Sequence, residues 1–109
     1  MDQRRVDVKP LTVNRAWRGR RFKTSEYKAY EQELLLRLPP IKVPEGSLIA
    51  YYEFGLSNPL SDWDNPIKPF QDILQIKYGF DDRQIVEAHI KKTIVGKGEE
   101  FVSFRLEPA

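Results

Sequence analysis

The first third of the chain has the hydrophobic spacing of a short strand followed by a helix. Residues 4–8 alternate weakly between polar and apolar and stop before Pro10, which predicts a first strand. Apolar residues then recur at intervals of three and four, as on one face of a helix, at Tyr27, Tyr30, Leu34 and Leu38. Thr24 and Ser25 can cap this helix, and Pro39 ends it.

The rest of the chain has the pattern strand, helix, strand, strand. Residues 47–55 are apolar on both faces, which predicts a central strand covered on both sides. A second helix is predicted from Asp64-Asn65-Pro66 to a stop at Gly79. Val86, Ala88 and Ile90 alternate with polar residues, which predicts a strand with one buried face that forms a hairpin with a last strand near 101–106.

These elements predict one α+β domain over residues 1–109: a small mixed sheet with two helices, in the order β-α-β-α-β-β. Only 40% of the 109 residues are hydrophobic, so the core is small and a partner subunit could complete it. The longest apolar run, residues 48–52, is far too short to span a membrane, and no targeting signal follows Met1. We therefore expect a cytoplasmic protein.

Composition limits the chemistry that a site could use. The chain has no Cys and one His, His89, which excludes disulfides, thiolate zinc sites and sites with two histidines. Any metal must therefore be held mainly by oxygen. Charge is uneven: residues 1–42 carry about +6 and residues 43–109 about −4. A basic half attracts a polyanion, while the acidic half concentrates carboxylates for another task.

Residues 14–23 form a basic and aromatic segment without any acid, which predicts a loop or ribbon that contacts nucleic acid. Its cations are Arg15, Arg18, Arg20, Arg21 and Lys23. Trp17 and Phe22 could stack on unpaired bases. The alternative is a solvated charged loop whose aromatics belong to the core or to a subunit contact.

The acidic residues have the most informative spacing. Asp62 and Asp64 are two apart on a segment expected to be extended, so their side chains should point the same way. Lys68 and Asp72 follow at steps of four along one helix face. The pair Asp81-Asp82 comes after the helix and joins the earlier acids only if the fold brings it back.

Converging carboxylates need a cation, and Mg²⁺ prefers oxygen ligands and keeps waters that suit phosphodiester hydrolysis. Lys68 would then contact the scissile phosphate. Simpler interpretations stay open, because Asp62 and Asp64 also suit a turn and a helix cap. Likewise Asp81-Asp82 suits a solvated turn, and Lys68 with Asp72 suits a surface ion pair.

The pattern of these residues resembles the RusA family of Holliday-junction resolvases. The resemblance rests on Asp62-x-Asp64-Asn65, Lys68, Asp72, Asp81-Asp82 and Gln84-Ile85-Val86-Glu87, with Asn14-Arg15 upstream. It covers roughly residues 11–105. In one member a run of arginines leads into the acidic motif, whereas this chain has Asn58-Pro59-Leu60-Ser61 there.

The resemblance implies an endonuclease of phages or prophages that acts in DNA recombination and repair. It implies a homodimer that uses Mg²⁺, with Mn²⁺ as a substitute, to nick two strands of a four-way DNA junction symmetrically. Metal-binding residues would be Asp62, Asp64 and Asp82, together with Asp81. Lys68 would be catalytic and would also contact DNA with Asn14 and the basic segment, while Asn65 and Asp72 would support the site.

Three hypotheses follow. The first is a structure-selective DNA endonuclease, which the complete set of matched acids and Lys68 favours. The second is a nucleic-acid-binding protein whose acidic cluster is structural or inactive. The third is a metal-binding or charge-paired assembly factor without a nucleic-acid role, which leaves the basic and aromatic segment unexplained.

Overall fold

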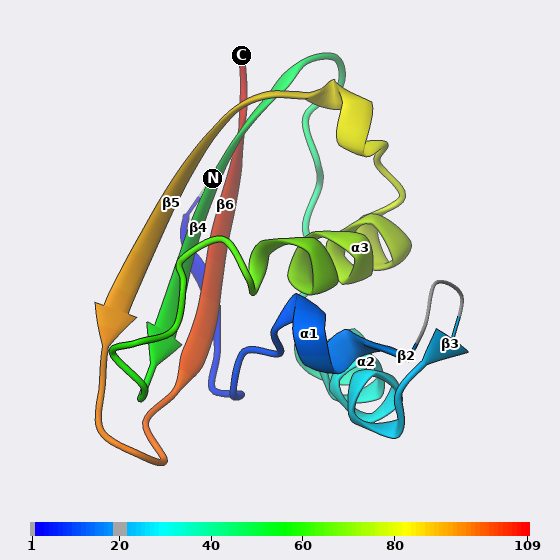
Figure 1. Cartoon of the computed structure of the whole chain (residues 1–109). Coiled ribbons are helices and arrows are strands. Elements are labelled where there is room, and N and C mark those ends of the chain that lie inside the picture. Colours follow the sequence, from blue (N-terminus) through cyan, green and yellow to red (C-terminus); the bar gives the residue numbers. More distant parts are fainter. Residues whose placement is uncertain (1, 19–21) are drawn as a thin grey trace.

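The computed structural model describes residues 2–18 and 22–109, and within them a mixed sheet is covered on one face by helices (Figure 1). The sheet has the strand order β1-β6-β4-β5, with β1 at Arg4–Val6, β4 at Leu48–Leu56, β5 at Ile85–Ile94 and β6 at Phe101–Pro108. Strand β4 is parallel to β5 and antiparallel to β6. The predicted α+β class and the central position of β4 are confirmed.

Both predicted helices form. Helix α2 spans Ser25–Arg37, and the Thr24 hydroxyl caps it by accepting from Tyr27 N. Helix α3 spans Ile67–Tyr78 and ends at Gly79, whose left-handed backbone (φ 73°) favours glycine. The structure adds a short helix, α1 (Val13–Ala16), and a 3-10 turn, η1 (Asp82–Gln84).

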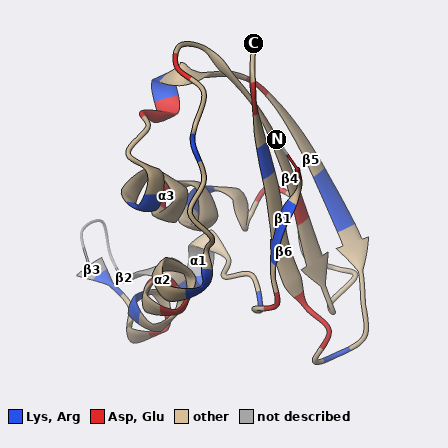
Figure 2. Cartoon of the chain, turned by 180° about the vertical axis from the view of Figure 1, so that it is seen from behind, with Lys and Arg blue, Asp and Glu red and all other residues tan. Residues whose placement is uncertain are grey.

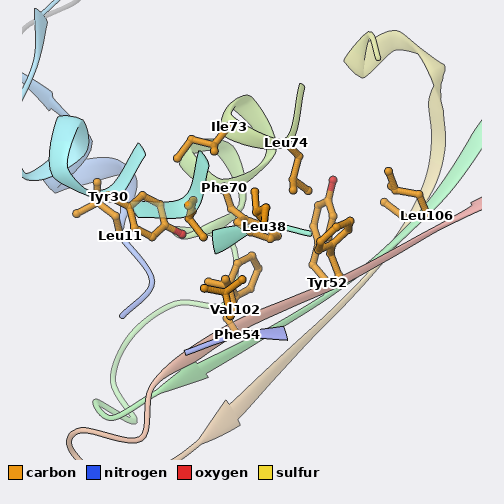
Figure 3. Packing of buried hydrophobic residues seen from close by; sticks show 14 of the residues in the cluster. Leu11, Tyr30, Leu38, Tyr52, Phe54, Phe70, Ile73, Leu74, Val102 and Leu106 are labelled. Atoms are coloured by element: carbon orange, nitrogen blue, oxygen red, sulfur yellow. The ribbon is translucent and has the colours of Figure 1, made fainter. Parts of the chain in front are cut away.

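The core lies between the sheet and helices α2 and α3 (Figure 3). At its centre the Phe70 ring of α3 meets Tyr52, Phe54 and Phe104 of the sheet edge to face, with centroids 5.5, 5.6 and 6.1 Å away. Behind them the Phe101 ring occupies the space that a Cβ at Gly55 would need. Aromatic packing therefore fixes α3 against β4 and β6, and so fixes the acidic segment that precedes α3.

The predicted hairpin of the last two strands is wrong. Strands β5 and β6 follow one another in the chain but lie on opposite sides of β4. The connection over residues 95–100 is longer than a two-residue hairpin turn and crosses the end of β4. The long apolar strand β4 takes both neighbours, because a central position lets its backbone groups form hydrogen bonds at both edges. The predicted cover on both sides of this strand is found on one side only, since Ile49, Tyr51 and Glu53 on the face away from the helices are half-buried.

The predicted buried face of β5 is also wrong. Val86 is 63% exposed, Ala88 is exposed, and Ile90 is only half-buried. Helix α3 packs over β4 and β6 and leaves β5 at the outer edge of the sheet, which Figure 2 shows from behind. Alternation in the sequence marked a strand correctly, but it could not tell whether a helix covers that strand.

None of the helices in the described residues has the length and apolar character required to cross a bilayer.

Candidate active site

The acidic segment lies in the turns between β4 and α3. Residues 63–66 form a turn, so Asp62 and Asp64 do not lie on the extended segment that the sequence predicted. The backbone oxygen of Asp64 accepts from Ile67 N at 3.2 Å, and the helix begins at Ile67 rather than at Asp64. Pro66 precedes the helix and provides no side-chain cap.

The carboxylates of Asp62 and Asp64 are exposed, and neither has a hydrogen-bond or ion-pair partner among the residues that the structure describes. Asp64 therefore does not act as the helix cap that one interpretation of the sequence suggested. Two unpaired carboxylates, two residues apart, are oxygen ligands accessible from solvent.

Lys68 and Asp72 lie on one face of α3, as predicted, and their side chains form an ion pair of 3.3 Å. The Lys68 side chain is 64% exposed, whereas Asp72 is largely covered. Burial raises the pKa of Tyr27 to about 12, and the carboxylates of Asp72 and Glu31 add to this effect. Asp72 thus faces both α2 and Lys68, and it holds the Lys68 ammonium near the beginning of α3.

Helix α1 lies beside the acidic segment although about fifty residues separate them in the chain. Val13 N donates to Asn65 O at 2.9 Å. This bond sets the backbone of Asn14 and Arg15 next to Asp64 and Asn65. Between these segments lies a mainly polar hollow of about 250 Å³, whose walls include Lys9, Thr12, Arg15, Asn58 and Ser61. The structure thus joins the predicted Asn14-Arg15 motif to the predicted Asp62-x-Asp64-Asn65 motif.

Lys92 is a site residue that the sequence did not reveal. From the edge strand β5 its ammonium donates to Pro59 O at 2.9 Å and to Ser61 O at 2.6 Å. These two carbonyl groups belong to the loop that leads into Asp62. Lys92 therefore positions this loop, and its sequence position, thirty residues downstream, gave no signal of the contact.

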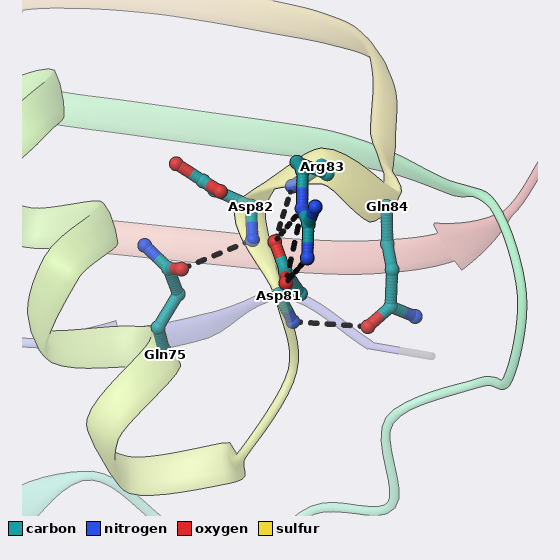
Figure 4. A network of polar contacts seen from close by, with 5 residues as sticks. All are labelled: Gln75, Asp81, Asp82, Arg83 and Gln84. Carbon is teal, nitrogen blue, oxygen red and sulfur yellow. Dashed lines mark hydrogen bonds and ion pairs between the residues drawn. The ribbon is translucent and has the colours of Figure 1, made fainter.

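The Asp81-Asp82 pair lies at the other end of α3 (Figure 4). Asp81 caps η1: its carboxylate accepts from Arg83 N at 2.9 Å and forms a 2.9 Å ion pair with Arg83 Nη2, while Gln84 Oε1 accepts from Asp81 N. The hydrogen bonds from Arg83 hold the pKa of Asp81 well below its usual range. Asp81 therefore has a structural role at this turn.

Asp82 is exposed, and its backbone N–H donates to Gln75 Oε1 at 3.0 Å, so the end of α3 fixes its position. The twelve residues of α3 span about 18 Å at about 1.5 Å per residue. They stand between Asp82 and the segment with Asp62 and Asp64. Within the described residues, no three Asp, Glu, His or Cys side chains gather closely enough to hold a metal ion.

The basic segment is partly described. Trp17–Arg18 (β2) and Phe22–Lys23 (β3) pair as an antiparallel ribbon, which agrees with the predicted loop or ribbon. Arg20 and Arg21 lie outside the described residues, and the side chain of Arg18 is not described either. Lys23 pairs with Glu31 at 3.0 Å, and the exposed Arg15 lies 3.8 Å from Glu26. Both cations are thus balanced by acids of α2.

The chain was compared with known protein families and with curated proteins. No protein-family model matches the chain, and no curated protein matches it.

Proposed function

We propose that this chain is a magnesium-dependent endonuclease of the RusA type that acts on four-way DNA junctions as a homodimer. The observation that carries the proposal is the bond from Val13 N to Asn65 O, which holds the backbone of helix α1 against the segment that carries the unpaired Asp62 and Asp64. Arg15 would bind an anion, and the two carboxylates would bind a cation. Groups of both kinds in neighbouring segments suit a metal-assisted reaction of a phosphodiester.

The donors present fit Mg²⁺, with Mn²⁺ as a substitute. Magnesium in proteins is usually held by one or two carboxylates, with waters and substrate phosphates as its remaining ligands. Asp62 and Asp64 would supply those carboxylates, and Asp82 would add a third from a second subunit. The bound ion would polarise the phosphoryl oxygen and lower the pKa of a bound water.

The surrounding residues would bind and orient the DNA backbone. Lys9 and Arg15 line the hollow beside Ser61, together with Glu26, which lies 3.8 Å from Arg15. A phosphate would bind there by taking the place of Glu26 at Arg15. Lys68 stands in the first turn of α3, where the N-terminal backbone amides have no side-chain cap. Its ammonium and that helix end would together stabilise negative charge that develops on the reacting phosphate.

Incubation with a synthetic four-way junction tests the proposal. We expect paired nicks in strands related by two-fold symmetry with Mg²⁺, none with EDTA, and none on a linear duplex of the same sequence. Junction that stays intact with Mg²⁺ and with Mn²⁺ would refute the nuclease.

A nucleic-acid-binding protein with structural acids is the second candidate, and the role of Asp81 as the cap of η1 favours it. It predicts salt-dependent binding of DNA without any cleavage. Junction binding measured in parallel with cleavage separates the two functions.

A further inference from the structure

Strand β5 is an unpartnered edge. It pairs with β4 on one side, and no strand of the described part of the chain lies on its other side. Its ten residues are mostly exposed, and the exposed fractions of Val86 and Ile94 are 63% and 51%. Proteins usually shorten, cover or bend such an edge, because its free backbone groups pair readily with another strand.

We infer that β5 is the surface where two copies of this chain pair, edge to edge and antiparallel, about a two-fold axis at His89. The inference deepens the homodimer of the proposed function by naming its interface. It rests on that proposal only for the expectation of a dimer.

Only one register of this antiparallel pairing sets the opposite charges of the two β5 strands against each other. A two-fold axis that continues the sheet must stand perpendicular to it, so residues of one face meet residues of the same face. With the axis at His89, Glu87 lies opposite Lys91 of the partner subunit, and Lys91 lies opposite the partner's Glu87. An axis at Glu87 or at Lys91 would set like charges against each other, which is destabilising. An axis at Ala88 or Ile90 would leave one of the two charges without an opposite one.

Contacts within one chain already hold the side chains of Glu87 and Lys91 on the face of the sheet that the helices do not cover. Glu87 Oε2 lies 2.6 Å from His89 Nε2, and the His89 ring stacks on Tyr51 with centroids 4.8 Å apart. Lys91 Nζ lies 3.9 Å from Glu53 Oε2 and stays 74% exposed. The side chains of Glu87 and His89 are each 54% exposed, so a partner strand can reach them.

The opposite face of β5 supplies apolar contact. A groove of about 510 Å³ runs between β5 and the beginning of α3. It is lined by Trp63, Ile67, Ala88, Ile90 and Lys92. In the same register Ala88 lies opposite the partner's Ile90, so pairing would extend this apolar surface from one subunit into the next. Trp63, one of its lining residues, is 56% exposed.

A charge swap tests the interface without DNA or metal, so its outcome does not depend on nuclease activity. The wild type should sediment at twice the 12.8 kDa chain mass at micromolar concentration. Glu87→Lys sets two lysine pairs across the axis, and Lys91→Glu sets two glutamate pairs, so each should raise the dimer Kd about tenfold or more. The double variant Glu87→Lys/Lys91→Glu should return the Kd to within about threefold of the wild type.

Mixing the two single variants gives the sharpest result. In a heterodimer every Lys meets a Glu, so the mixture should form heterodimers in preference to either homodimer. Glu99→Lys and Lys97→Glu, in the turn between β5 and β6, are matched controls and should leave the Kd unchanged. Circular dichroism checks that each variant is folded. A monomeric wild type, single variants that dimerise normally, or a double variant that stays monomeric would each overturn the inference.

Discussion

The Lys92 ammonium of edge strand β5 donates to the backbone oxygen of Ser61, 2.6 Å away, in the residue directly before Asp62. A second bond, to Pro59 O, holds the same loop. The loop that carries the candidate metal ligands is therefore anchored on the strand that we infer to form the dimer interface. Its conformation depends on a lysine that contacts neither DNA nor metal in our proposal.

Lys92→Met should loosen this loop. The methionine keeps the apolar part of the side chain but removes both hydrogen bonds, so Asp62 and Asp64 lose part of their fixed position. We expect junction cleavage to slow by about ten- to a hundredfold, with little change in melting temperature or junction affinity. Single-turnover cleavage measures the rate. Lys97→Met is the matched control, and an equal loss in both variants would remove the positioning role.

Asp64→Asn should abolish cleavage while junction binding remains. The amide is a poor Mg²⁺ ligand, and loss of one carboxylate from a site that acts as a unit lowers the rate by about a thousandfold or more. Removing a negative charge near DNA does not weaken binding. A cleavage assay with a gel-shift assay measures both. Asp2→Asn, an exposed acid outside the site, should behave as wild type, and full activity of Asp64→Asn would exclude this metal site.

Local signals predicted most of the secondary structure. Thr24 caps α2, and Gly79 ends α3, because both effects act within one turn of the chain. The sequence did not reveal that β5 and β6 lie on opposite sides of β4. Sheet order depends on contacts between distant segments, which alternation within one strand does not encode.

The site was predicted as a set of residue types, but its geometry was not. Helical periodicity was enough to predict the Lys68–Asp72 pair. The bond between Val13 and Asn65 and the Lys92 anchor depend on tertiary packing, so no spacing could indicate them. The assumption of an extended segment at Asp62 failed because Pro66 and the start of α3 impose a turn.

Lys68→Ala should lower the cleavage rate far more than the affinity for the junction. If the ammonium acts mainly on charge that develops in the transition state, its loss costs about a hundredfold in rate and little in binding. Single-turnover rates and Kd values on the same junction separate the effects. The control is Lys97→Ala, an exposed lysine in the turn between β5 and β6. Equal losses of rate and affinity would make Lys68 only a DNA anchor.

Asp81→Asn should make stability less sensitive to acid. Hydrogen bonds from Arg83 lower the pKa of Asp81 in the folded state. Their contribution to the free energy of unfolding is therefore fully present above the ordinary carboxyl pKa of about 4, and it is lost as the pH falls toward the pKa of the folded state. Asparagine keeps the cap but not the charge. We expect the urea midpoint of the wild type to fall more between pH 5 and about pH 2.5 than that of the variant. If the urea midpoints of the wild type and the variant fell by the same amount over this pH range, this role of Asp81 would be contradicted.

Antiparallel pairing of β5 about His89 has a consequence for the metal site, because it sets Val86 opposite the partner's Lys92. The loop at residues 59–61 of the partner then lies at the same end of β5 as Asp82, whereas α3 separates Asp82 from the loop of its own chain.

Each site would therefore combine Asp62 and Asp64 of one subunit with Asp82 of the other. Inactive Asp64→Asn mixed with inactive Asp82→Asn should then regain nicking of one strand, because each heterodimer keeps one site with all three acids. Counting nicks per junction after the subunits have exchanged measures this recovery. Asp62→Asn mixed with Asp64→Asn is the control and should stay inactive, since every site of its heterodimer lacks one acid. If the first mixture stays as inactive as the control, each site belongs to a single chain.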